Sequence, residues 1–384
     1  MPPAPDPARS RPCSLPALQD LPPRDARLCL DVGRFCRREL GLAPGAHLLL
    51  ALSGGADSTA LAVLLTLLAP RMDLRLSALS VDHGLRPESR GETRQVCALC
   101  RDLGIACAVR RADTAAAAAA WGCGLEEAGR KVRYALLEEE RAALNADWIL
   151  LGHHAGDLSE DVLLRLTRGA GWPGLAGMAP RDDARRLLRP LLFTAPEALR
   201  ALLLRLGIHW SEDASNASLD YRRNRLRHEV LPLLRRENPA LDRGFATLHR
   251  LGSLDGDFWE ETLDRALAAH PWQNGTENGA PAVTLPRGLL SALHPAARLR
   301  LYVRVCRALR ANNSARGGGT RGQPRAATLL ALDAALREGR GNTRFQLPGA
   351  LEALVRGGCV RFTAVQPSRS KASAASVTPR TSRP

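Results

Sequence analysis

Six residues, Ser53 to Ser58, with the sequence Ser-Gly-Gly-Ala-Asp-Ser, separate two apolar segments of different character. Residues 47–52 have the length and leucine content of a buried strand, and residues 59–65 have the composition of a buried helix. Glycines between a strand and a helix allow a sharp turn and let backbone N–H groups approach a ligand closely. Because the N-terminus of a helix attracts negative charge, this stretch predicts a phosphate-binding loop.

The loop differs from the common phosphate loop, because it lacks the Gly-Lys-Ser/Thr ending and carries an aspartate in the turn. The residues expected to contact the phosphates are Ser53, Gly54, Gly55, Asp57 and Ser58. A plainer interpretation is a Ser/Gly turn in which Asp57 or Ser58 caps the helix. The six residues alone favour neither interpretation.

Strand-like and helix-like segments alternate in residues 25–151. Apolar runs predict strands at 47–52, 74–81, 105–109 and 148–151, and helical periodicity predicts helices at 25–40, 88–103 and 125–144. The alanine run 115–120 is compatible with a helix or a loop. This alternation predicts a doubly wound, mainly parallel α/β sheet, which binds ligands at the carboxyl ends of its strands.

Polar residues directly follow these predicted strands. Asp82 and His83 come after the second strand, and His153 comes after the fourth. Because the carboxyl ends of parallel strands meet at one edge of a sheet, these residues and the loop after the first strand should border one crevice.

The rest of the chain reads as mainly helical, with a second folded part near the C-terminus. We expect a disordered Pro- and Arg-rich leader at 1–24, the α/β domain at 25–215, a helical Arg-rich connector at 216–280, a small α+β domain at 281–364 and a disordered basic tail at 365–384.

The formal net charge of +15 indicates a polyanionic partner, with nucleic acid as the first candidate. Lysine occurs only at Lys131 and Lys371, so the arginine excess also indicates a GC-rich coding bias, and charge clusters are more informative than total charge. Residues 221–236 form one cluster, with six arginines and a single acid, Glu229. Guanidinium groups bind phosphates through two parallel hydrogen bonds, which suits RNA, although a solvated basic helix has the same composition.

Several features predict a cytoplasmic protein without a membrane anchor. No apolar run approaches the ~20 residues of a membrane span. The first residues lack the continuous apolar region of a secretory signal. Nine cysteines, an odd number without the spacing of a disulfide framework, fit a reducing compartment.

Two acid-containing motifs have the residue types of a polar site. Glu126, Arg130 and Arg133 lie at i, i+4 and i+7 and share one face of the predicted helix 125–144, as either a surface ion pair or a binding face. Asp157 and Glu160 lie at i and i+3 at the start of another helix, as a helix cap, a metal site or a substrate site. No HExxH order or cysteine pairing accompanies them to favour zinc.

Taken with their order, these motifs resemble a known family. The order strand, SGGADS, helix resembles the PP-loop of the N-type ATP pyrophosphatases, which split ATP into AMP and pyrophosphate. Four later segments resemble motifs of the tRNA(Ile)-lysidine synthetases in the order of that family: VDHGLR at 81–86, ExxxRxxRY at 126–134, HHxxDxxE at 153–160, and the WxxDxSN segment at 210–216 with RNR at 223–225. The matches cover about half of the chain, from about residue 47 to 234, and the chain departs from the family pattern at Gly156, where a second acid often stands.

The resemblance implies an enzyme that uses ATP and Mg²⁺ to join L-lysine to C2 of the wobble cytidine of a CAU-anticodon tRNA(Ile), which changes decoding from AUG to AUA. It implies catalytic roles for Asp57, Arg130, Asp157 and Glu160, with Asp57 also near Mg²⁺. Nucleotide contacts are implied for Ser53, Gly54, Gly55, Asp57, Ser58, Asp82, His83, His153 and Arg225. Contacts to tRNA or lysine are implied for Glu126, Arg133, Asp157, Glu160, Arg222, Arg223 and Arg227.

Two other functions share parts of this pattern. A tRNA thiolase would use the same loop, and Cys97 and Cys100 form a CxxC pair, but their place on an amphipathic helix favours core packing. A catalytically silent, nucleotide-gated RNA-binding protein is the second alternative. The C-terminal part only loosely resembles the substrate-binding extension of the family, and the oligomeric state, a homodimer included, stays open.

Overall fold

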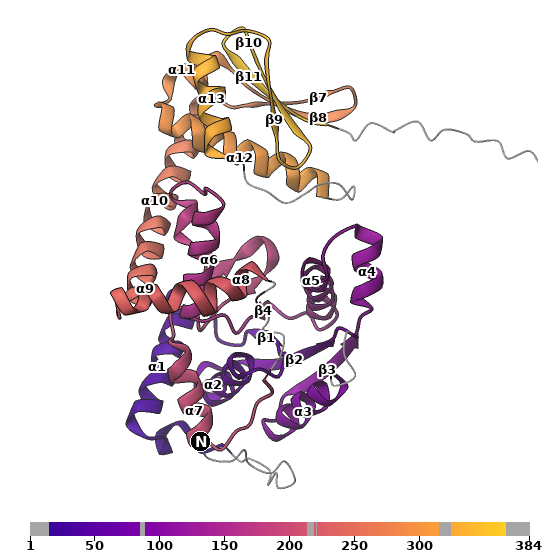
Figure 1. Cartoon of the computed structure of the whole chain (residues 1–384), viewed down its shortest axis with the longest axis vertical. Helices are drawn as coiled ribbons and strands as arrows, with labels where there is room; N and C mark the ends of the chain where they lie inside the picture. The colour runs from indigo at the N-terminus through magenta and orange to yellow at the C-terminus, as the bar shows by residue number, and fades with distance from the viewer. Residues whose placement is uncertain (1–14, 85–88, 213–218, 220, 315–323, 366–384) are drawn as a thin grey trace, which may run out of the picture. The chain divides into compact units, whose positions relative to one another are not determined.

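The computed structural model describes residues 15–84, 89–212, 219, 221–314 and 324–365. The chain divides into two compact units. The first comprises residues 1–165 and 176–250, and the second comprises residues 166–175 and 251–384. Figure 1 shows the elements of both units.

The elements up to residue 240 are mainly those of an alternating α/β chain. The helices are α1 (Pro23–Arg38), α2 (Ala56–Met72), α3 (Ser89–Asp102), α4 (Thr114–Trp121), α5 (Leu125–Ala143), α6 (Ala155–Thr167), α7 (Pro196–Arg205), α8 (Arg222–Arg225) and α9 (Leu231–Glu237). The strands are β1 (His47–Ala51), β2 (Arg75–Asp82), β3 (Ala106–Arg111), β4 (Trp148–Leu150), β5 (Arg181–Asp182) and β6 (Leu187–Leu188).

The strands of the first unit form one sheet in the order β3-β2-β1-β4-β6-β5. All neighbouring strands are parallel except β5 and β6. The predicted doubly wound, mainly parallel sheet is therefore confirmed. The chain moves outward from β1 to β3 and then returns to place β4 on the other side of β1. Such a switch leaves a crevice at the carboxyl ends of β1 and β4.

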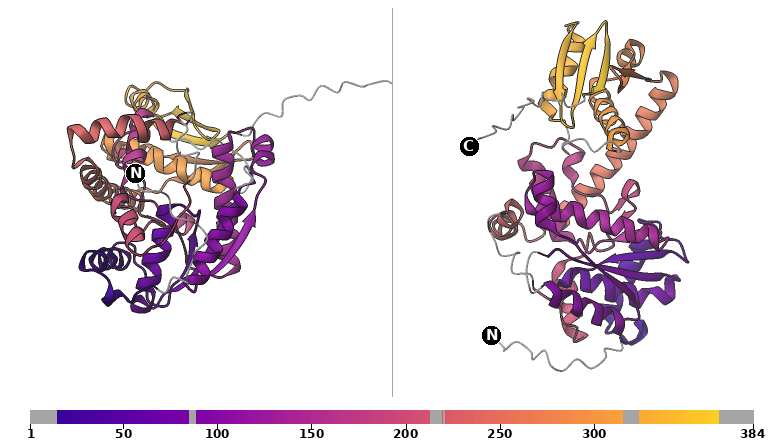
Figure 2. Two further views of the ribbon diagram at one scale, coloured as in Figure 1. Left: turned by 60° about the horizontal axis from the view of Figure 1, so that its bottom comes forward. Right: turned by 90° about the vertical axis from the view of Figure 1, so that its right-hand side faces the viewer.

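Helices cover both faces of this sheet (Figures 1 and 2). Alternate residues of β1 serve the two faces, as expected for a strand that is buried on both sides. Leu48 and Leu50 pack with apolar residues of α1, α2, α3 and α7, whereas Leu49 packs with Leu137 of α5. The central strand that carries the loop is thus held in the middle of the first unit.

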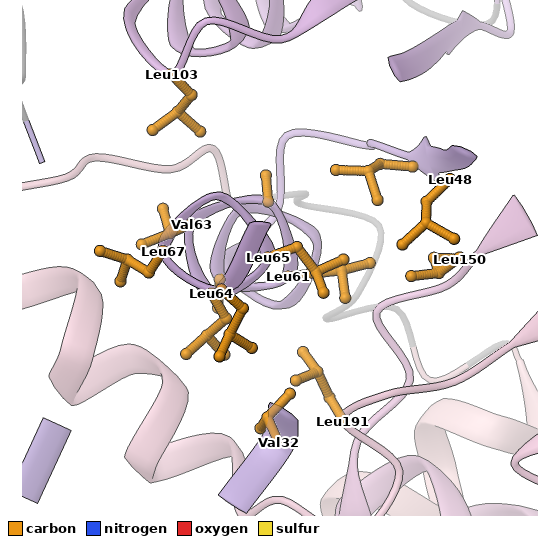
Figure 3. Packing of buried hydrophobic residues seen from close by; sticks show 14 of the residues in the cluster. Val32, Leu48, Leu61, Val63, Leu64, Leu65, Leu67, Leu103, Leu150 and Leu191 are labelled. Atoms are coloured by element: carbon orange, nitrogen blue, oxygen red, sulfur yellow. The ribbon is translucent and has the colours of Figure 1, made fainter. Parts of the chain in front are cut away.

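Helix α2, which follows the loop, is apolar and buried all round. Figure 3 shows Leu61 and Leu65 directed toward Leu48 and Leu150 of the sheet, with Val32 of α1 on another side of the helix. A helix buried on every side has no solvent-facing stripe, which explains its continuous apolar sequence. Its packing anchors the loop at its N-terminus.

Several local features differ from the predictions or complete them. The alanine run is helical, and Asp113 Oδ1 caps α4 by accepting from the Ala116 N–H at 2.9 Å. Strands β5 and β6 have two residues each and no apolar run to reveal them. Within the predicted leader, residues 15–24 form a short helical turn at Leu18–Asp20 and the start of α1.

The long helix α10 (Leu241–Ala269) begins in the first unit and continues in the second. The second unit adds the helices α11 (Arg287–Ala292), α12 (Pro295–Ser314) and α13 (Ala326–Arg337) and the strands β7 (Gln273–Glu277), β8 (Ala280–Leu285), β9 (Thr343–Leu347), β10 (Leu351–Arg356) and β11 (Cys359–Ala364). The segment predicted as a helical connector, 216–280, therefore also contains a strand.

The strands of the second unit form an antiparallel sheet in the order β7-β8-β11-β10-β9, seen in the right-hand view of Figure 2. One face packs on α12 and α13, where the rings of Tyr302 and Phe362 lie 5.8 Å apart. The other face carries polar side chains such as Arg344, Gln346 and Glu352. Among the described helices of the whole chain, none is both long and apolar enough to cross a membrane.

Candidate active site

The loop after β1 has the backbone conformation of a phosphate cradle. Gly54 has a φ of +85°, a conformation that side-chain-bearing residues rarely adopt. Ser58 Oγ accepts from the Ser53 N–H at 3.2 Å and donates to Gly55 O at 3.0 Å, so the turn is closed on itself. Gly55 is the N-cap of α2, and no side chain caps it. The plainer prediction of an Asp57 or Ser58 cap is therefore wrong, and the first-turn N–H groups are left to a ligand.

The end of β4 lies directly against this loop. A Cβ atom added to Gly152 would meet three backbone atoms of Asp57 and Ser58 at 3.0 Å. Only glycine permits that approach without a shift of the backbone. The close approach brings the histidine pair that follows β4 to the side chain of Asp57.

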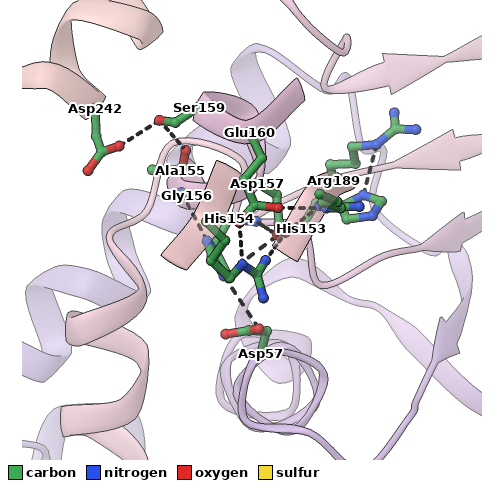
Figure 4. A network of polar contacts seen from close by, with 12 residues as sticks. Asp57, His153, His154, Ala155, Gly156, Asp157, Ser159, Glu160, Arg189 and Asp242 are labelled. Atoms are coloured by element: carbon green, nitrogen blue, oxygen red, sulfur yellow. Dashed lines mark hydrogen bonds and ion pairs between the residues drawn. The ribbon is translucent and has the colours of Figure 1, made fainter. Parts of the chain in front are cut away.

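His154 lies between two carboxylates, one from each segment (Figure 4). Its Nε2 is 3.4 Å from Asp57 Oδ2 and 3.6 Å from Asp157 Oδ2. The Gly156 N–H donates to Nδ1 at 3.0 Å, so the ring proton is placed on Nε2, facing the carboxylates. Burial by itself would lower the pKa of His154, but the two carboxylates have the larger combined effect and raise it above the ordinary value. Protonation of both ring nitrogens would break the hydrogen bond from the Gly156 N–H.

Asp157 and Glu160 form a compact charge cluster with two arginines of the segment 222–230. Arg223 donates to Asp157 Oδ1 at 2.7 Å and to Glu160 Oε2 at 2.5 Å. Arg227 donates to Asp157 Oδ1 at 3.1 Å and, through its Nε, to Glu160 Oε1. The Glu160 side chain is only 2% exposed, so burial without these arginines would be costly. The four formal charges sum to zero.

The second carboxylate oxygen of Asp157 also accepts a hydrogen bond. Asp157 Oδ2 accepts from the His154 N–H at 2.9 Å, which fixes the turn at the start of α6. Burial alone would raise the pKa of Asp157, but His154 and Arg223 outweigh it and hold the pKa at about 2. Asp157 is therefore ionised at neutral pH.

His153 is held by a different arginine. Arg189 Nε donates to His153 Nδ1 at 3.1 Å, and Arg189 Nη1 donates to Ala179 O at 2.6 Å. Removal from water, together with the nearby cations Arg189, Arg223 and Arg133, lowers the pKa of His153 to about 3. His153 is therefore neutral at physiological pH.

The residues predicted on α5 differ in their surroundings. Glu126 and Arg130 are exposed, and Arg133 is half-buried. The guanidinium carbons of Arg130 and Arg133 lie 5.6 Å and 6.0 Å from the ring centre of Tyr134. The charges of Arg130 and Arg223 act on Arg133, whose pKa is lowered chiefly by burial. This places Arg133 near the cluster on α6, while Glu126 has no described contact that links it there.

Asp82 and His83 lie where β2 ends. The Gly84 N–H donates to Asp82 Oδ1 at 2.9 Å, and Arg111 Nε is 3.9 Å from Asp82 Oδ2. His83 Nδ1 lies 3.2 Å from Thr114 Oγ1, and burial is the main cause of its lowered pKa. The rest of the VDHGLR segment, Leu85 and Arg86, lies outside the described residues.

The other predicted arginines are on the surface of α8. Arg222 and Arg225 are exposed, and Arg225 Nη1 donates to Leu219 O at 2.7 Å. They are accordingly available to a large ligand rather than buried with Arg223. The predicted residues Asp213, Ser215 and Asn216 lie outside the described part of the chain.

One carboxylate oxygen beside the loop is placed to bind Mg²⁺. Asp57 Oδ1 is buried and has no hydrogen-bond partner among the described residues. Such an oxygen beside a phosphate loop suits Mg²⁺, which commonly takes one or two carboxylates together with phosphate oxygens and water. Among the described residues no group of three or more His, Cys, Asp or Glu side chains is placed to hold a metal. The residues thus fit a Mg²⁺ ion that shares its ligands with a bound nucleotide.

Comparisons with known proteins identify the family of this chain. The sequence profile of the PP-loop domain family matches residues 33–234. The tRNA(Ile)-lysidine synthase of Nitratidesulfovibrio vulgaris is 48% identical over 84% of this chain and 93% of that protein. The tRNA(Ile)-lysidine synthase of Thermobifida fusca is 35% identical over 86% of this chain and 94% of that protein. This chain belongs to the tRNA(Ile)-lysidine synthase family. The predicted resemblance is confirmed.

A solved structure supports the fold of this family member. The U34-tRNA thiolase NcsA from Methanococcus maripaludis, solved with its 4Fe-4S cluster, aligns with a TM-score of 0.52. The alignment covers 60% of this chain and 80% of that chain at 16% identity, so the likeness concerns the fold alone.

Three residues of this candidate site were not predicted. His154 links Asp57 to Asp157, and its place next to His153 in one motif was the only available signal. Arg189 follows β6, a strand too short to predict. Ser211 donates its N–H to Gly54 O at 2.9 Å and thereby ties a distant segment to the loop, with no local pattern to reveal it.

The cysteine pair has a third neighbour in this lysidine synthase family member. Cys107 of β3 interacts with both Cys97 and Cys100, of which Cys100 is fully buried. Burial raises the pKa of Cys97, and the hydrogen bond with Cys100 raises that of Cys107. The same hydrogen bond lowers the pKa of Cys100, which is fully buried in the core of the first unit. Its burial agrees with the core packing predicted for this residue.

Proposed function

We propose that this chain ligates L-lysine to C2 of the wobble cytidine of a CAU-anticodon tRNA(Ile), with conversion of ATP to AMP and pyrophosphate. The observation that carries the proposal is the junction of Asp57 of the loop with His154 and Asp157 of the HHxxDxxE motif. Family membership supports the same activity. We further propose a cytoplasmic location.

The first step would activate the cytidine. The C2 oxygen attacks the α-phosphorus of ATP, an O–P bond forms, and the bond to pyrophosphate breaks. The uncapped N–H groups of α2 and the turn at Gly54 would hold the departing pyrophosphate. Mg²⁺, when bound near Asp57, would neutralise part of the phosphate charge. Arg130, which is exposed in the first half of α5, would stabilise the adenylated intermediate.

In the second step the lysine amine attacks C2, and AMP leaves with the former C2 oxygen. A lysine amine must lose a proton to become a nucleophile, and Asp157 or Glu160 would bind the cationic groups or accept that proton. These carboxylates are saturated by Arg223 and Arg227 in the structure. Because two guanidinium groups already neutralise the two carboxylates, a lysine cation would gain most from them if at least one guanidinium moves away.

A phosphate could cause that movement. Arg223 and Arg227 are each about one third exposed, at 31% and 32%, so a phosphate of the adenylate or of tRNA has a route to them. We propose that such a phosphate takes over one guanidinium and thereby frees a carboxylate for lysine. Because binding couplings are reciprocal, lysine should in turn tighten binding of the phosphate-bearing ligand. Lysine would then be bound mainly when the activated tRNA is present.

The primary test is incubation of the purified protein with Mg-ATP, labelled L-lysine and bulk tRNA. Label confined to the CAU-anticodon isoleucine tRNA, with release of AMP, is the expected result. AMP formation on tRNA without label would keep the adenylating site and replace lysine with another nucleophile. No AMP at all would favour the silent RNA-binding alternative, and incorporation that depends on a sulfur donor would favour a thiolase.

A further inference from the structure

The first unit contains a basic groove that begins at Asp82, an implied nucleotide contact, and includes arginines to which the proposed reaction gives no role. It lies between α3 and β3, has a volume of about 610 Å³, and is lined by Arg94, Arg101 and Arg111 among other residues. Among the described residues, Arg94 and Arg101 have no ion pair. Arg111 has only the 3.9 Å approach to Asp82.

The spacing of these arginines indicates a ligand with several negative charges. Arg94 and Arg101 lie seven positions apart on α3, which places them on the same face of the helix. A rise of 1.5 Å per residue separates them by about 10 Å along the helix axis. Arginines spaced along a helix in this way, with Arg111 on the neighbouring strand, can contact successive phosphates of a chain.

The floor of the groove is apolar. It includes Ala98 of α3 and Val109 of β3, and Val109 is 45% exposed. β3 is the outermost strand on its side of the sheet, so the groove is not enclosed by a further strand. Apolar side chains that lie beside arginines suit a nucleic acid, because the sugars or bases can contact the apolar side chains while the phosphates contact the arginines.

The groove also contains one acid, Asp82, at the end nearest the phosphate loop. Its Oδ1 is engaged by the Gly84 N–H. Its charge would repel a phosphate placed next to it, so the favourable positions lie along Arg94 and Arg101, toward the other end. The charge pattern therefore directs a polyanion along α3 and away from Asp82.

We infer that this groove binds the sugar–phosphate backbone of the tRNA substrate. The inference rests on the proposed function, because it assumes that tRNA is the bound polyanion. The groove would add affinity on the α3 side of the first unit, independently of the arginines on α8. It reads the RNA backbone and gives no base specificity by itself.

The test compares two triple variants with the wild-type protein. The groove variant is Arg94→Ala, Arg101→Ala and Arg111→Ala. The control variant is Arg27→Ala, Arg37→Ala and Arg38→Ala, which removes the same charge from exposed positions on α1. For each protein the dissociation constant of CAU-anticodon tRNA is measured over a series of salt concentrations, together with the affinity for ATP without tRNA.

The groove variant should bind tRNA about tenfold more weakly than the control variant, with the slope of log K against log salt smaller by about 2–3. ATP affinity should be unchanged, which also reports correct folding. Equal tRNA binding by the two variants would overturn the inference, and so would a selective loss of ATP affinity, which would assign the groove to the nucleotide. If wild-type protein incorporates no lysine, the proposed function fails, whereas the groove is judged only by the difference between the variants.

Discussion

Two regions of the candidate site differ in how their carboxylates are paired: Asp57 in the loop, and the pair Asp157 and Glu160 on α6. Asp57 keeps one buried oxygen without a hydrogen-bond partner among the described residues. Asp157 and Glu160 have every oxygen engaged, mainly by Arg223 and Arg227. Asp57 is thus ready for a cation, whereas the other pair must first lose a partner. The carboxylates differ in this way because the neighbouring helices supply different numbers of cations.

Removal of the ready carboxylate should have the largest effect. Asp57→Ala should abolish adenylation, with a loss of at least about 10²–10³-fold, because the loop then lacks its cation ligand. The measurement is AMP formation on tRNA without lysine. Near-normal AMP formation in this variant would show that the unpaired oxygen has no catalytic use and would remove the contrast between the two sets.

Removal of a paired carboxylate should divide the two steps. Asp157→Ala should slow lysine transfer by roughly 100-fold, as expected for loss of a base or binding group, and slow adenylation much less. It should also lower the free energy of unfolding by about 3 kcal/mol, because Arg223 and Arg227 lose an anionic partner. Single-turnover measurement of each step and denaturant unfolding test these outcomes.

The matched control is Asp161→Ala. It removes another acid of α6, whose ion pair is with Arg165 rather than with Arg223 or Arg227. In this control variant, adenylation and lysine transfer should each keep the wild-type rate. Equal losses of adenylation and lysine transfer in Asp157→Ala would count against the assignment of Asp157 to the lysine step.

The lowered pKa values of His153 and Asp157 predict that the protein loses stability as the pH falls. The folded-state pKa of His153 is about 3, below the ordinary value of about 6.5, so its stabilising contribution is present above about pH 6.5 and is lost as pH falls. Asp157, with a folded-state pKa of about 2, loses its contribution only below about pH 4.

Unfolding free energies at a series of pH values test the order of these two losses. In His153→Asn the free energy of unfolding should fall less between about pH 6.5 and about pH 4 than in the wild-type protein. Below about pH 4 it should fall as in the wild-type protein. An unchanged pH profile in this variant would mean that His153 is not held neutral by Arg189 and its neighbours.

The smallest effect is expected from a change that leaves every charge in place. Gly152→Ala should cost about 1–3 kcal/mol of stability, because its Cβ meets the backbone of Asp57 and Ser58 at 3.0 Å. It should also weaken adenylation by moving Asp57 relative to His154. Gly244→Ala, where an added Cβ meets nothing within 4 Å, is the control and should be neutral or slightly stabilising. Similar results for both variants would show that the approach of β4 to the loop is not tight.

Much of the fold followed from local patterns. The apolar runs predicted β1 to β4, and the position of the glycines predicted the loop conformation at Gly54. The short strands β5 and β6 were missed because two-residue strands have no period. They depend on backbone pairing instead, β6 with β4 and β5 with β6. The predicted site residues were placed at one edge of the sheet, but their partners could not be read from spacing. Arg223 is 63 positions from Glu160 and 66 from Asp157.

The sequence by itself determined the α/β alternation, the phosphate loop and the order of motifs that marks the family, because each depends on residues close together in the chain. The tertiary structure alone decided which carboxylates are neutralised and which keep an unpaired oxygen. It also decided that Arg94 and Arg101 line an open groove while Arg223 and Arg227 are paired with buried acids. Local periodicity reports which face of an element is apolar, whereas the charge state of a side chain depends on neighbours that only the packed helices and strands bring together.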